Sequence, residues 1–236
     1  MTRPLLATAG LSKRYGTVQA LVDAKIEVAA GEFVAVLGPS GSGKSTLFRC
    51  LTRLTEPDAG EIHLAGRPFH HLRGRKLAAA RRDIGVVFQQ FNLIRRRSAL
   101  ENVLSGRLGP TPLWRVAAGR FAPRDIARGR DALAAVGLAD QFHQRADTLS
   151  GGQQQRVAIA RAIAQESRIL LADEPVASLD PATANSVLEL IHGLTRSAGL
   201  GVVCTLHQPE LAMRYADRVL TMDAGRLGVR PGASRG

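Results

Sequence analysis

The sequence predicts an α/β fold built around a mainly parallel β-sheet. Apolar runs of strand length, such as Phe33–Leu37 and Ile169–Ala172, are typical of strands that are covered on both faces. Segments with helical spacing, such as Ile126–Val136, alternate with these runs, and this alternation favours parallel pairing through right-handed crossovers. The 236 residues, 45% of them hydrophobic, suit one large α/β domain or two small ones and exclude a wholly disordered chain.

The expected elements follow one another along the whole chain. Strands are expected at Thr17–Val22, Lys25–Val28, Phe33–Leu37, Glu61–Leu64, Ile84–Phe88, Ile169–Ala172, Gly201–Leu206 and Arg218–Met222. Helices are expected at Leu47–Leu54, Ile126–Val136, after Ser150, at Ala182–Ser197 and at Pro209–Tyr215. Residues 92–148 are interpreted as a helical insertion, residues 1–228 as one domain and residues 229–236 as a short flexible tail, with fraying expected from Arg226 onwards.

The charge balance restricts the choice of partner. Lys and Arg number 32 against 20 Asp and Glu, a formal net charge of +12, with basic clusters at Arg73–Arg82 and Arg95–Arg97. Nucleic acid, an anionic membrane face and an anionic ligand are the candidate partners. Aromatic residues make up only 4% and do not alternate with the basic ones, so base stacking is not indicated and we expect no nucleic acid. A position beside an anionic membrane is the more specific hypothesis for the basic clusters. The alternative is a solvated basic surface with no partner.

Cysteine content and hydropathy narrow the class further. The two cysteines, Cys50 and Cys204, exclude a disulfide scaffold and fit a reducing cytoplasm, and we expect both to be buried thiols. No segment approaches the ~20 apolar residues that span a bilayer. The first residues, Met1–Ala7, are too short an apolar stretch for a signal peptide.

One glycine-rich segment has a specific phosphate-binding pattern. It matches G-x-x-x-x-G-K-[ST], between an expected strand and an expected helix, with the residues Gly38, Pro39, Ser40, Gly41, Ser42, Gly43, Lys44, Ser45 and Thr46. The glycines let successive N–H groups point at phosphate oxygens, and the helix N-terminus adds partial positive charge. Lys44 is expected to reach the β- and γ-phosphates and Ser45 to bind Mg²⁺. A simple glycine-rich turn would not explain both the motif and its context.

Two further motifs lie downstream. Asp173 and Glu174 follow the apolar run Ile169–Ala172, where a carboxylate of P-loop proteins holds Mg²⁺. We assign that role to Asp173 and assign the polarisation of an attacking water to Glu174. The segment Leu149–Gln153 begins a helix, with Ser150 as its expected N-cap and glycines that expose N–H groups. Two phosphate-binding loops in one chain suggest two chains that share a nucleotide.

In their order, these motifs resemble the ATP-binding subunit of ABC transporters over about residues 5–228. Four smaller features resemble that family as well: Gln89 in its Gln-loop position, Ser178–Asp180 as a D-loop, His207 as the switch histidine, and Tyr15, with Val18 nearby, as the aromatic that stacks on adenine. The resemblance implies a RecA-like P-loop core, an antiparallel β subdomain on the N-terminal side and an inserted helical subdomain.

The resemblance also implies the chemistry and the partners. The chain would bind ATP and Mg²⁺, with Ser45, Gln89 and Asp173 at the metal and Glu174, His207 and Gln89 in catalysis. A head-to-tail dimer of ATPase subunits would join the P-loop of one copy to the signature of the other; this opposing signature consists of Ser150, Gly151, Gly152 and Gln153, with Asp180 beside it. Membrane permease subunits would be direct partners and a periplasmic solute-binding protein an indirect one, at the cytoplasmic face of the inner membrane.

Within the family, three segments resemble the ATPase of phosphonate importers: Ile84–Leu93, Glu101–Trp114 and Ala172–Pro181. The implied solute is therefore a phosphonate. Import of another small solute stays open, since none of these residues contacts the solute. A soluble ABC-type ATPase of DNA repair or translation is disfavoured because the chain has neither tandem units nor a long coiled-coil insertion. A small-molecule kinase would leave Leu149–Gln153 and Gln89 unexplained.

Overall fold

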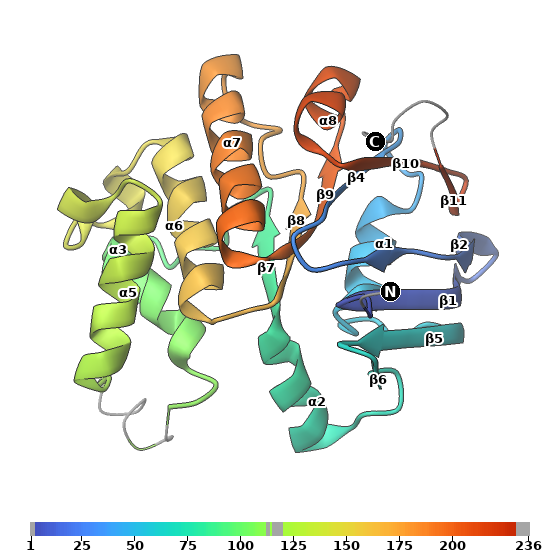
Figure 1. The fold of residues 1–236 in the computed structure, drawn as a ribbon, viewed down its shortest axis with the longest axis horizontal. Coiled ribbons are helices and arrows are strands. Elements are labelled where there is room, and N and C mark those ends of the chain that lie inside the picture. Colours follow the sequence, from blue (N-terminus) through green and yellow to red (C-terminus); the bar gives the residue numbers. More distant parts are fainter. Residues whose placement is uncertain (1–2, 112–113, 115–119, 230–236) are drawn as a thin grey trace.

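The computed structural model describes residues 3–111, 114 and 120–229, and within them the central feature is a six-stranded sheet (Figure 1). Its strands lie in the order β11-β10-β4-β9-β8-β7, parallel except for the antiparallel β10–β11 pair. Their bounds are β4 Phe33–Leu37, β7 Ile84–Phe88, β8 Ile169–Asp173, β9 Gly201–Leu206, β10 Arg218–Asp223 and β11 Arg226–Val229. The mainly parallel sheet predicted from the apolar runs is confirmed.

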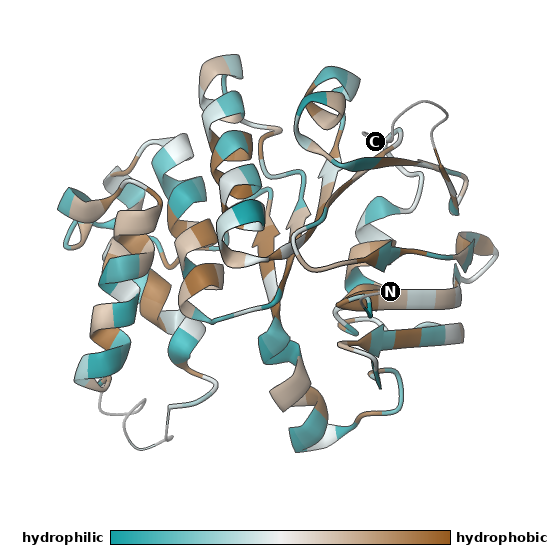
Figure 2. Cartoon of the chain, viewed as in Figure 1, coloured by the Kyte–Doolittle hydropathy of each residue, from teal (hydrophilic) through white to brown (hydrophobic). Residues whose placement is uncertain are grey.

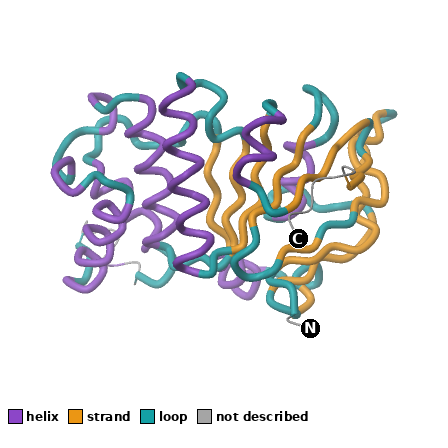
Figure 3. The backbone as a smooth tube through the Cα atoms, turned by 45° about the horizontal axis from the view of Figure 1, so that its top comes forward, coloured by secondary structure: helices purple, strands orange, loops and turns teal. Residues whose placement is uncertain are grey.

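A second sheet is formed by the N-terminal part of the chain. It is antiparallel, in the order β2-β1-β5-β6 with β3 paired to β1. Its strands are β1 Leu6–Tyr15, β2 Val18–Ala24, β3 Glu27–Val28, β5 Ala59–Leu64 and β6 Arg67–Pro68. Figure 3 shows these strands on the side of the molecule opposite the main group of helices. The antiparallel subdomain implied by the resemblance is present.

The helices pack against the central sheet and beside it. They are α1 Lys44–Leu51, α2 Gly74–Ala80, α3 Ala99–Leu104, α5 Pro123–Ala135, α6 Gly151–Ala164, α7 Pro181–Ala198 and α8 Pro209–Tyr215. Short 3₁₀ turns occupy η1 Arg81–Asp83, η2 Ser105–Arg107, η3 Ala139–Gln141 and η4 Ala146–Thr148. The helices α3 and α5 lie within residues 92–148 and pack on α6, which follows this segment. We call α3, α5 and α6 together the helical layer.

Two hydrophobic clusters lie on the two faces of the central sheet. Alternate residues of β4 divide between them: Phe33 and Ala35 join the cluster with α6, α7 and the helical layer, whereas Val34 and Val36 join the cluster with α1 and the antiparallel sheet. All five residues of β4 are buried, as a strand with both faces covered requires. Figure 2 shows the apolar character of the central strands between the more polar outer helices. Cys50 and Cys204 are buried as predicted, and burial raises the pKa of the Cys50 thiol to about 11.

Several expected boundaries were wrong. The helix after the glycine-rich segment begins at Lys44 rather than Leu47, because the phosphate-binding loop leads directly into its first turn. The end of the chain was expected to fray from Arg226, but Arg226–Val229 forms β11 because its backbone pairs with β10. The remainder of the predicted tail, residues 230–236, lies outside the described residues. The long strand β1 was not predicted, since its residues do not alternate regularly between buried and exposed; its pairing with β5 is also interrupted between Ala9 and Ser12.

A buried ion pair joins the helical layer to the core. Arg107 is 6% exposed and its Nε donates to Oδ1 of Asp125, which is 7% exposed, at 3.0 Å. Its Nη1 also donates to the carbonyl of Ala164 at 3.1 Å and to Glu166 at 2.8 Å. One guanidinium therefore ties η2, α5 and the end of α6 together.

We expect Arg107→Met to lower the free energy of unfolding by about 3–5 kcal/mol, because it leaves the carboxylate of Asp125 buried without its partner. Urea denaturation measures the change. The control is Arg97→Ala, which removes an exposed pair with Glu101 and should cost about 0.5 kcal/mol or less. Equal losses in the two variants would contradict the structural role of Arg107.

Candidate functional site

The glycine-rich loop connects the end of β4 to the first turn of α1 and has no room for side chains at two points. A Cβ on Gly38 would lie 2.4 Å from the carbonyl oxygen of Met222 in β10. A Cβ on Gly43, where φ is +111°, would lie 2.4 Å from the carbonyl oxygen of Ala20 in β2. The N–H of Gly225 also donates to the carbonyl of Ser42 at 2.9 Å. Contacts with two other strands therefore fix the backbone of this loop.

Lys44 points into the loop that it follows. Its Nζ donates to the carbonyls of Gly38 at 2.8 Å and Pro39 at 3.0 Å, and its side chain is 5% exposed. The same Nζ lies 3.9 Å from Oε1 of Glu174. The hydroxyl of Ser42 is buried without a hydrogen-bond partner. The loop thus encloses one positive charge and keeps one hydroxyl unused, as a site for a phosphate chain requires.

A threonine of the neighbouring strand contacts both acidic residues at the end of β8. Thr205, buried in β9, donates its hydroxyl to Oδ1 of Asp173 at 2.9 Å. Its Oγ1 accepts the N–H of Glu174 at 2.8 Å. Glu174 has a left-handed backbone with φ of +50°, a conformation that costs energy for a residue with a side chain. Thr205 therefore fixes the side chain of Asp173 and the backbone of Glu174.

His207 follows β9 and contacts the second of these carboxylates. Its Nε2 lies 2.7 Å from Oε1 of Glu174, within hydrogen-bond distance. Glu174 is 20% exposed and His207 is 39% exposed, so solvent reaches the pair. Glu174 lines both the main cavity and a smaller pocket of about 100 Å³ that contains His207. The carboxylate therefore connects the histidine to the main cavity.

The main cavity has a volume of about 580 Å³ and brings together ten of the predicted site residues. These are Val18, Ser40, Gly41, Gly43, Lys44, Ser45, Thr46, Gln89, Asp173 and Glu174. Tyr15 pairs with Val18 across the β1–β2 hairpin and is 45% exposed. Sequence reasoning missed Gln19, Ala20, Ala224 and Gly225, which also line the cavity; they carry no motif and arrive there through the pairing of distant strands.

The residues Leu149–Gln153 lie elsewhere. Ser150 caps α6 as predicted: its hydroxyl accepts the N–H of Gln153 at 3.3 Å, and its own N–H donates to the side chain of Gln153 at 2.9 Å. Ser150, Gly152 and Gln153 line a separate pocket of about 290 Å³. Figure 1 shows that the first turn of α6 lies at the same edge of the molecule as the end of β8, displaced toward the helical layer.

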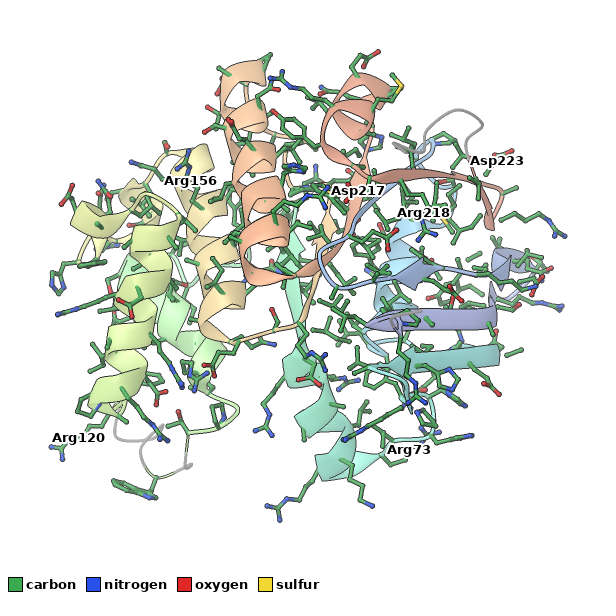
Figure 4. The ribbon with its side chains drawn as sticks, viewed as in Figure 1. Arg73, Arg120, Arg156, Asp217, Arg218 and Asp223 are labelled. Carbon is green, nitrogen blue, oxygen red and sulfur yellow. The ribbon has the colours of Figure 1, made fainter. Side chains whose placement is uncertain are left out.

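The start of α7 packs against this helix. A Cβ on Gly152 would lie 2.3 Å from Cγ2 of Thr183, so only glycine fits there. Asp180 caps α7 by accepting the N–H of Thr183 at 3.0 Å, and hydrogen bonds from Thr183 lower the pKa of that exposed carboxyl. Arg156 of α6, labelled in Figure 4, donates to the carbonyl of Val136 at 2.8 Å and to Oγ of Ser186 in α7 at 2.6 Å. The starts of α6 and α7 therefore form one unit.

The start of β4 is also fixed by charged groups from the other end of the chain. Oδ2 of Asp217 accepts the N–H of Phe33 at 2.8 Å, and Arg218 lies 3.1 Å from Glu32. Figure 4 labels Asp217 and Arg218 beside this strand. The strand that ends in the phosphate-binding loop is thus fixed at its beginning as well.

No group of three or more His, Cys, Asp or Glu residues is placed to hold a metal ion in the described part of the chain. Likewise, none of the described helices is both long and apolar enough to cross a membrane.

The site consists of a P-loop between the parallel strand β4 and the helix α1, and of carboxylates at the end of β8, two strands away in the sheet. This combination defines a nucleotide-binding cassette. Comparisons with known proteins agree. The family model described as ABC transporter matches residues 21–177. The phosphonates import ATP-binding protein PhnC 1 of Pseudomonas aeruginosa is 48% identical over 223 residues, which cover 92% of this chain and 80% of that protein. The hypophosphite import ATP-binding protein HtxD of Stutzerimonas stutzeri is 47% identical over 217 residues, which cover 92% of this chain and 64% of that protein.

The solved structures give the same result. A dimeric ATP-binding cassette in a post-hydrolysis state, bound to ADP and Pi, superposes with a TM-score of 0.81 at 34% identity, covering 98% of this chain and 99% of that one. The chain belongs to the ABC transporter family, and it carries the ATPase cassette of that family. The resemblance found in the sequence is confirmed.

Gly41 and Gly43 form a matched pair for testing the loop. Both have positive φ, +80° and +111°, but a Cβ on Gly41 would meet no atom within 4 Å, whereas one on Gly43 would collide with Ala20. We expect Gly41→Ala to cost about 1–2 kcal/mol of stability from backbone strain alone. Gly43→Ala should cost about 1–3 kcal/mol more because of overpacking. Urea unfolding measures both, and an equal cost would show that contact with β2 does not constrain the loop.

Proposed function

We propose that this chain binds ATP with Mg²⁺ and hydrolyses it in a head-to-tail dimer, and thereby drives the import of phosphonates through membrane permease subunits. The observation that carries the nucleotide site is the single cavity that Lys44, Ser45, Gln89, Asp173 and Glu174 line together. The assignment of the solute is supported by relatives at 45–48% identity that are named as phosphonate importers. The alignments cover most of this chain and most of each of those relatives.

The residues present fit Mg²⁺. In nucleotide sites Mg²⁺ takes one or two carboxylates together with phosphate and water oxygens, rather than a cage of protein ligands. Asp173, the hydroxyl of Ser45 and the side-chain amide of Gln89 line the same cavity and supply such oxygens. When bound, the ion would neutralise charge on the phosphates.

The carboxylate of Glu174 is the group assigned to the attacking water. Thr205 holds the backbone of Glu174, and His207 approaches the same carboxylate oxygen that lies 3.9 Å from Nζ of Lys44. A water between Glu174 and the terminal phosphate would lose its proton toward Oε1. Lys44 supplies positive charge close to that point, and catalysis of this kind relies on positioning and electrostatic stabilisation. His207 is assigned to hold the carboxylate and to sense the phosphate.

The dimer follows from the separation of two phosphate-binding features. The first turn of α6, at Ser150–Gln153, lines a pocket that has no residue in common with the P-loop cavity of the same chain. A second copy in head-to-tail orientation would bring its own first turn of α6 over this P-loop. The similar cassette solved as a dimer with ADP and Pi supports a dimer. Permease subunits would then dock on the helical layer, at the cytoplasmic face of the inner membrane.

Hypophosphite import is a second candidate. The relative named as a hypophosphite importer is 47% identical, almost the same as the relative named for phosphonates. The residues on which both assignments rest bind nucleotide and not solute, so they do not separate the two. Phosphonate is favoured because seven of eight relatives at 45–48% identity are named for it.

The solute is tested by transport. A strain without this chain should lose growth on a phosphonate as its sole phosphorus source and keep growth on phosphate. Restoring the chain should restore growth, and restoring Lys44→Ala should not. Loss of growth on hypophosphite alone would replace the proposed solute with the second candidate. Unchanged growth on both would reject both.

A mutant separates nucleotide binding from hydrolysis. Glu174→Gln keeps the shape of the side chain but removes its basicity, and loss of a general base costs roughly 10²–10⁴-fold in rate. ATP binding should survive, because Lys44, Ser45 and Asp173 remain. The variant should therefore accumulate as an ATP-bound dimer in size-exclusion chromatography.

The control adds Ser150→Arg to Glu174→Gln. An arginine at the first turn of α6 would block the approach of this turn to the opposite phosphates, so the dimer should be lost while ATP binding to the monomer remains. A Glu174→Gln protein that stays monomeric in saturating MgATP, or that hydrolyses at the parent rate, would reject the assignment.

A further inference from the structure

The segment that carries Gln89 has a backbone that the local sequence does not favour. Gln89 follows β7 and lines the nucleotide cavity. Two and three residues later, Phe91 and Asn92 both have left-handed backbones, with φ of +54° and +49°. A bulky residue such as phenylalanine adopts this region only when its surroundings hold it there. The position of Gln89 therefore depends on whatever holds residues 91 and 92.

Arg161 holds them. Its Nη1 donates to the carbonyl of Asn92 at 2.7 Å and its Nη2 donates to the carbonyl of Phe91 at 3.2 Å. Burial lowers the pKa of Arg161, and no neighbouring carboxylate contributes to that shift. The planar fork of the guanidinium is suited to two acceptors at once, which a lysine ammonium is not. Its donors are thus directed at the backbone of this loop rather than at an acid.

Arg161 lies on a helix that is packed tightly against the strand before the loop. A Cβ on Gly85 of β7 would lie 2.7 Å from Cβ of Ala162, so α6 and β7 touch without an intervening side chain. The side chain of Gln165 donates to the carbonyl of Ile84 at 2.9 Å, at the beginning of the same strand. The helix α6 and its C-cap residue Gln165 therefore contact the start of β7 and the loop that follows it.

The same helix begins with Ser150–Gln153, the part assigned to the nucleotide of the partner copy. Arg161 lies about three turns further along, or ~16 Å at ~1.5 Å per residue. The loop also reaches back to this first turn, since a Cβ on Gly151 would lie 3.9 Å from Cζ of Phe91. Phe91 thus lies between the first turn of α6 and Arg161: its ring faces Gly151, and its carbonyl accepts a hydrogen bond from Arg161.

We propose that Arg161 is a positioning residue that couples the two nucleotide sites of the dimer. It fixes Gln89 in the site of its own chain relative to the helix whose first turn contacts the nucleotide held by the other chain. The inference rests on the proposed function, because it takes Gln89 as a ligand in the hydrolytic site. Arg161 itself does not line the nucleotide cavity.

A double-mutant cycle in the full-length chain tests the coupling. We expect Arg161→Ala to lower kcat for ATP roughly 10- to 100-fold, the usual effect of removing a group that orients a metal ligand, without a change in KM for ATP. Arg161→Lys should lose nearly as much, although it keeps the charge. When Gln89 is already alanine, Arg161→Ala should cause no further loss. Independent, multiplying losses would overturn the proposal.

Arg156→Ala is the matched control. Arg156 lies on the same helix and also donates to two acceptors, but these belong to Val136 and Ser186 and not to the loop. Any loss that it causes should multiply with the loss from Gln89→Ala. If Arg156→Ala shows the same non-additivity as Arg161→Ala, the effect is general damage to α6 and the coupling through Arg161 is overturned.

Trypsin gives a readout that does not depend on the role of Gln89. Arg95, Arg96 and Arg97 are exposed and follow directly on the loop. Cleavage there should be faster in Arg161→Ala and Arg161→Lys than in the parent and in Arg156→Ala, under conditions where all four are folded by circular dichroism. If cleavage is faster and kcat falls in Arg161→Ala, but kcat does not fall in Gln89→Ala, the role of Gln89 is overturned. The link between Arg161 and the loop is still supported in that case. Unchanged cleavage in both Arg161 variants would overturn that link.

Discussion

The P-loop backbone is in close contact with two other strands, and this contact constrains the geometry of the nucleotide site. The loop after β4 touches Met222 in β10 at Gly38 and touches Ala20 in β2 at Gly43, and neither position has space for a Cβ. Because β10 belongs to the central sheet and β2 to the antiparallel sheet, the loop lies where the two sheets meet. The direction of Lys44 is therefore set by tertiary packing as much as by the glycines of the motif itself.

Strand order then determines which side chains share the cavity. The strands β4, β9, β8 and β7 lie side by side and parallel, so their carboxyl ends meet at one edge of the sheet. This places the P-loop next to Thr205, Thr205 next to Asp173, and Asp173 next to the segment of Gln89. Segments far apart in sequence thus form a continuous row of polar groups. The buried hydroxyl of Thr205 is central to that row, because it contacts both adjacent residues at the end of β8.

Sequence patterns predicted what depends on local chemistry. Buried strands such as Phe33–Leu37 and Gly201–Leu206 were predicted to the residue, since unbroken apolar runs have few other solutions. Most of the predicted P-loop residues and both acidic residues at the end of β8 do line one cavity. What was missed depends on distant partners. Strand β11 exists only because β10 pairs with it, and Gly225 reaches the cavity only through that pairing. Thr205 and Arg161 have no motif of their own.

The position of β4 in the sheet has a consequence for biosynthesis. Its two neighbours, β9 and β10, begin only at Gly201 and Arg218, so the strand that leads into the P-loop is made long before the strands that flank it. Contacts of such large sequence separation form late in folding. A growing chain on the ribosome would carry residues 38–46 without the backbone shape that they need. Nucleotide can then stabilise only a chain in which β9 and β10 have already been made, because a ligand stabilises the state that binds it. ATP would thus distinguish chains that contain these flanking strands from shorter nascent ones.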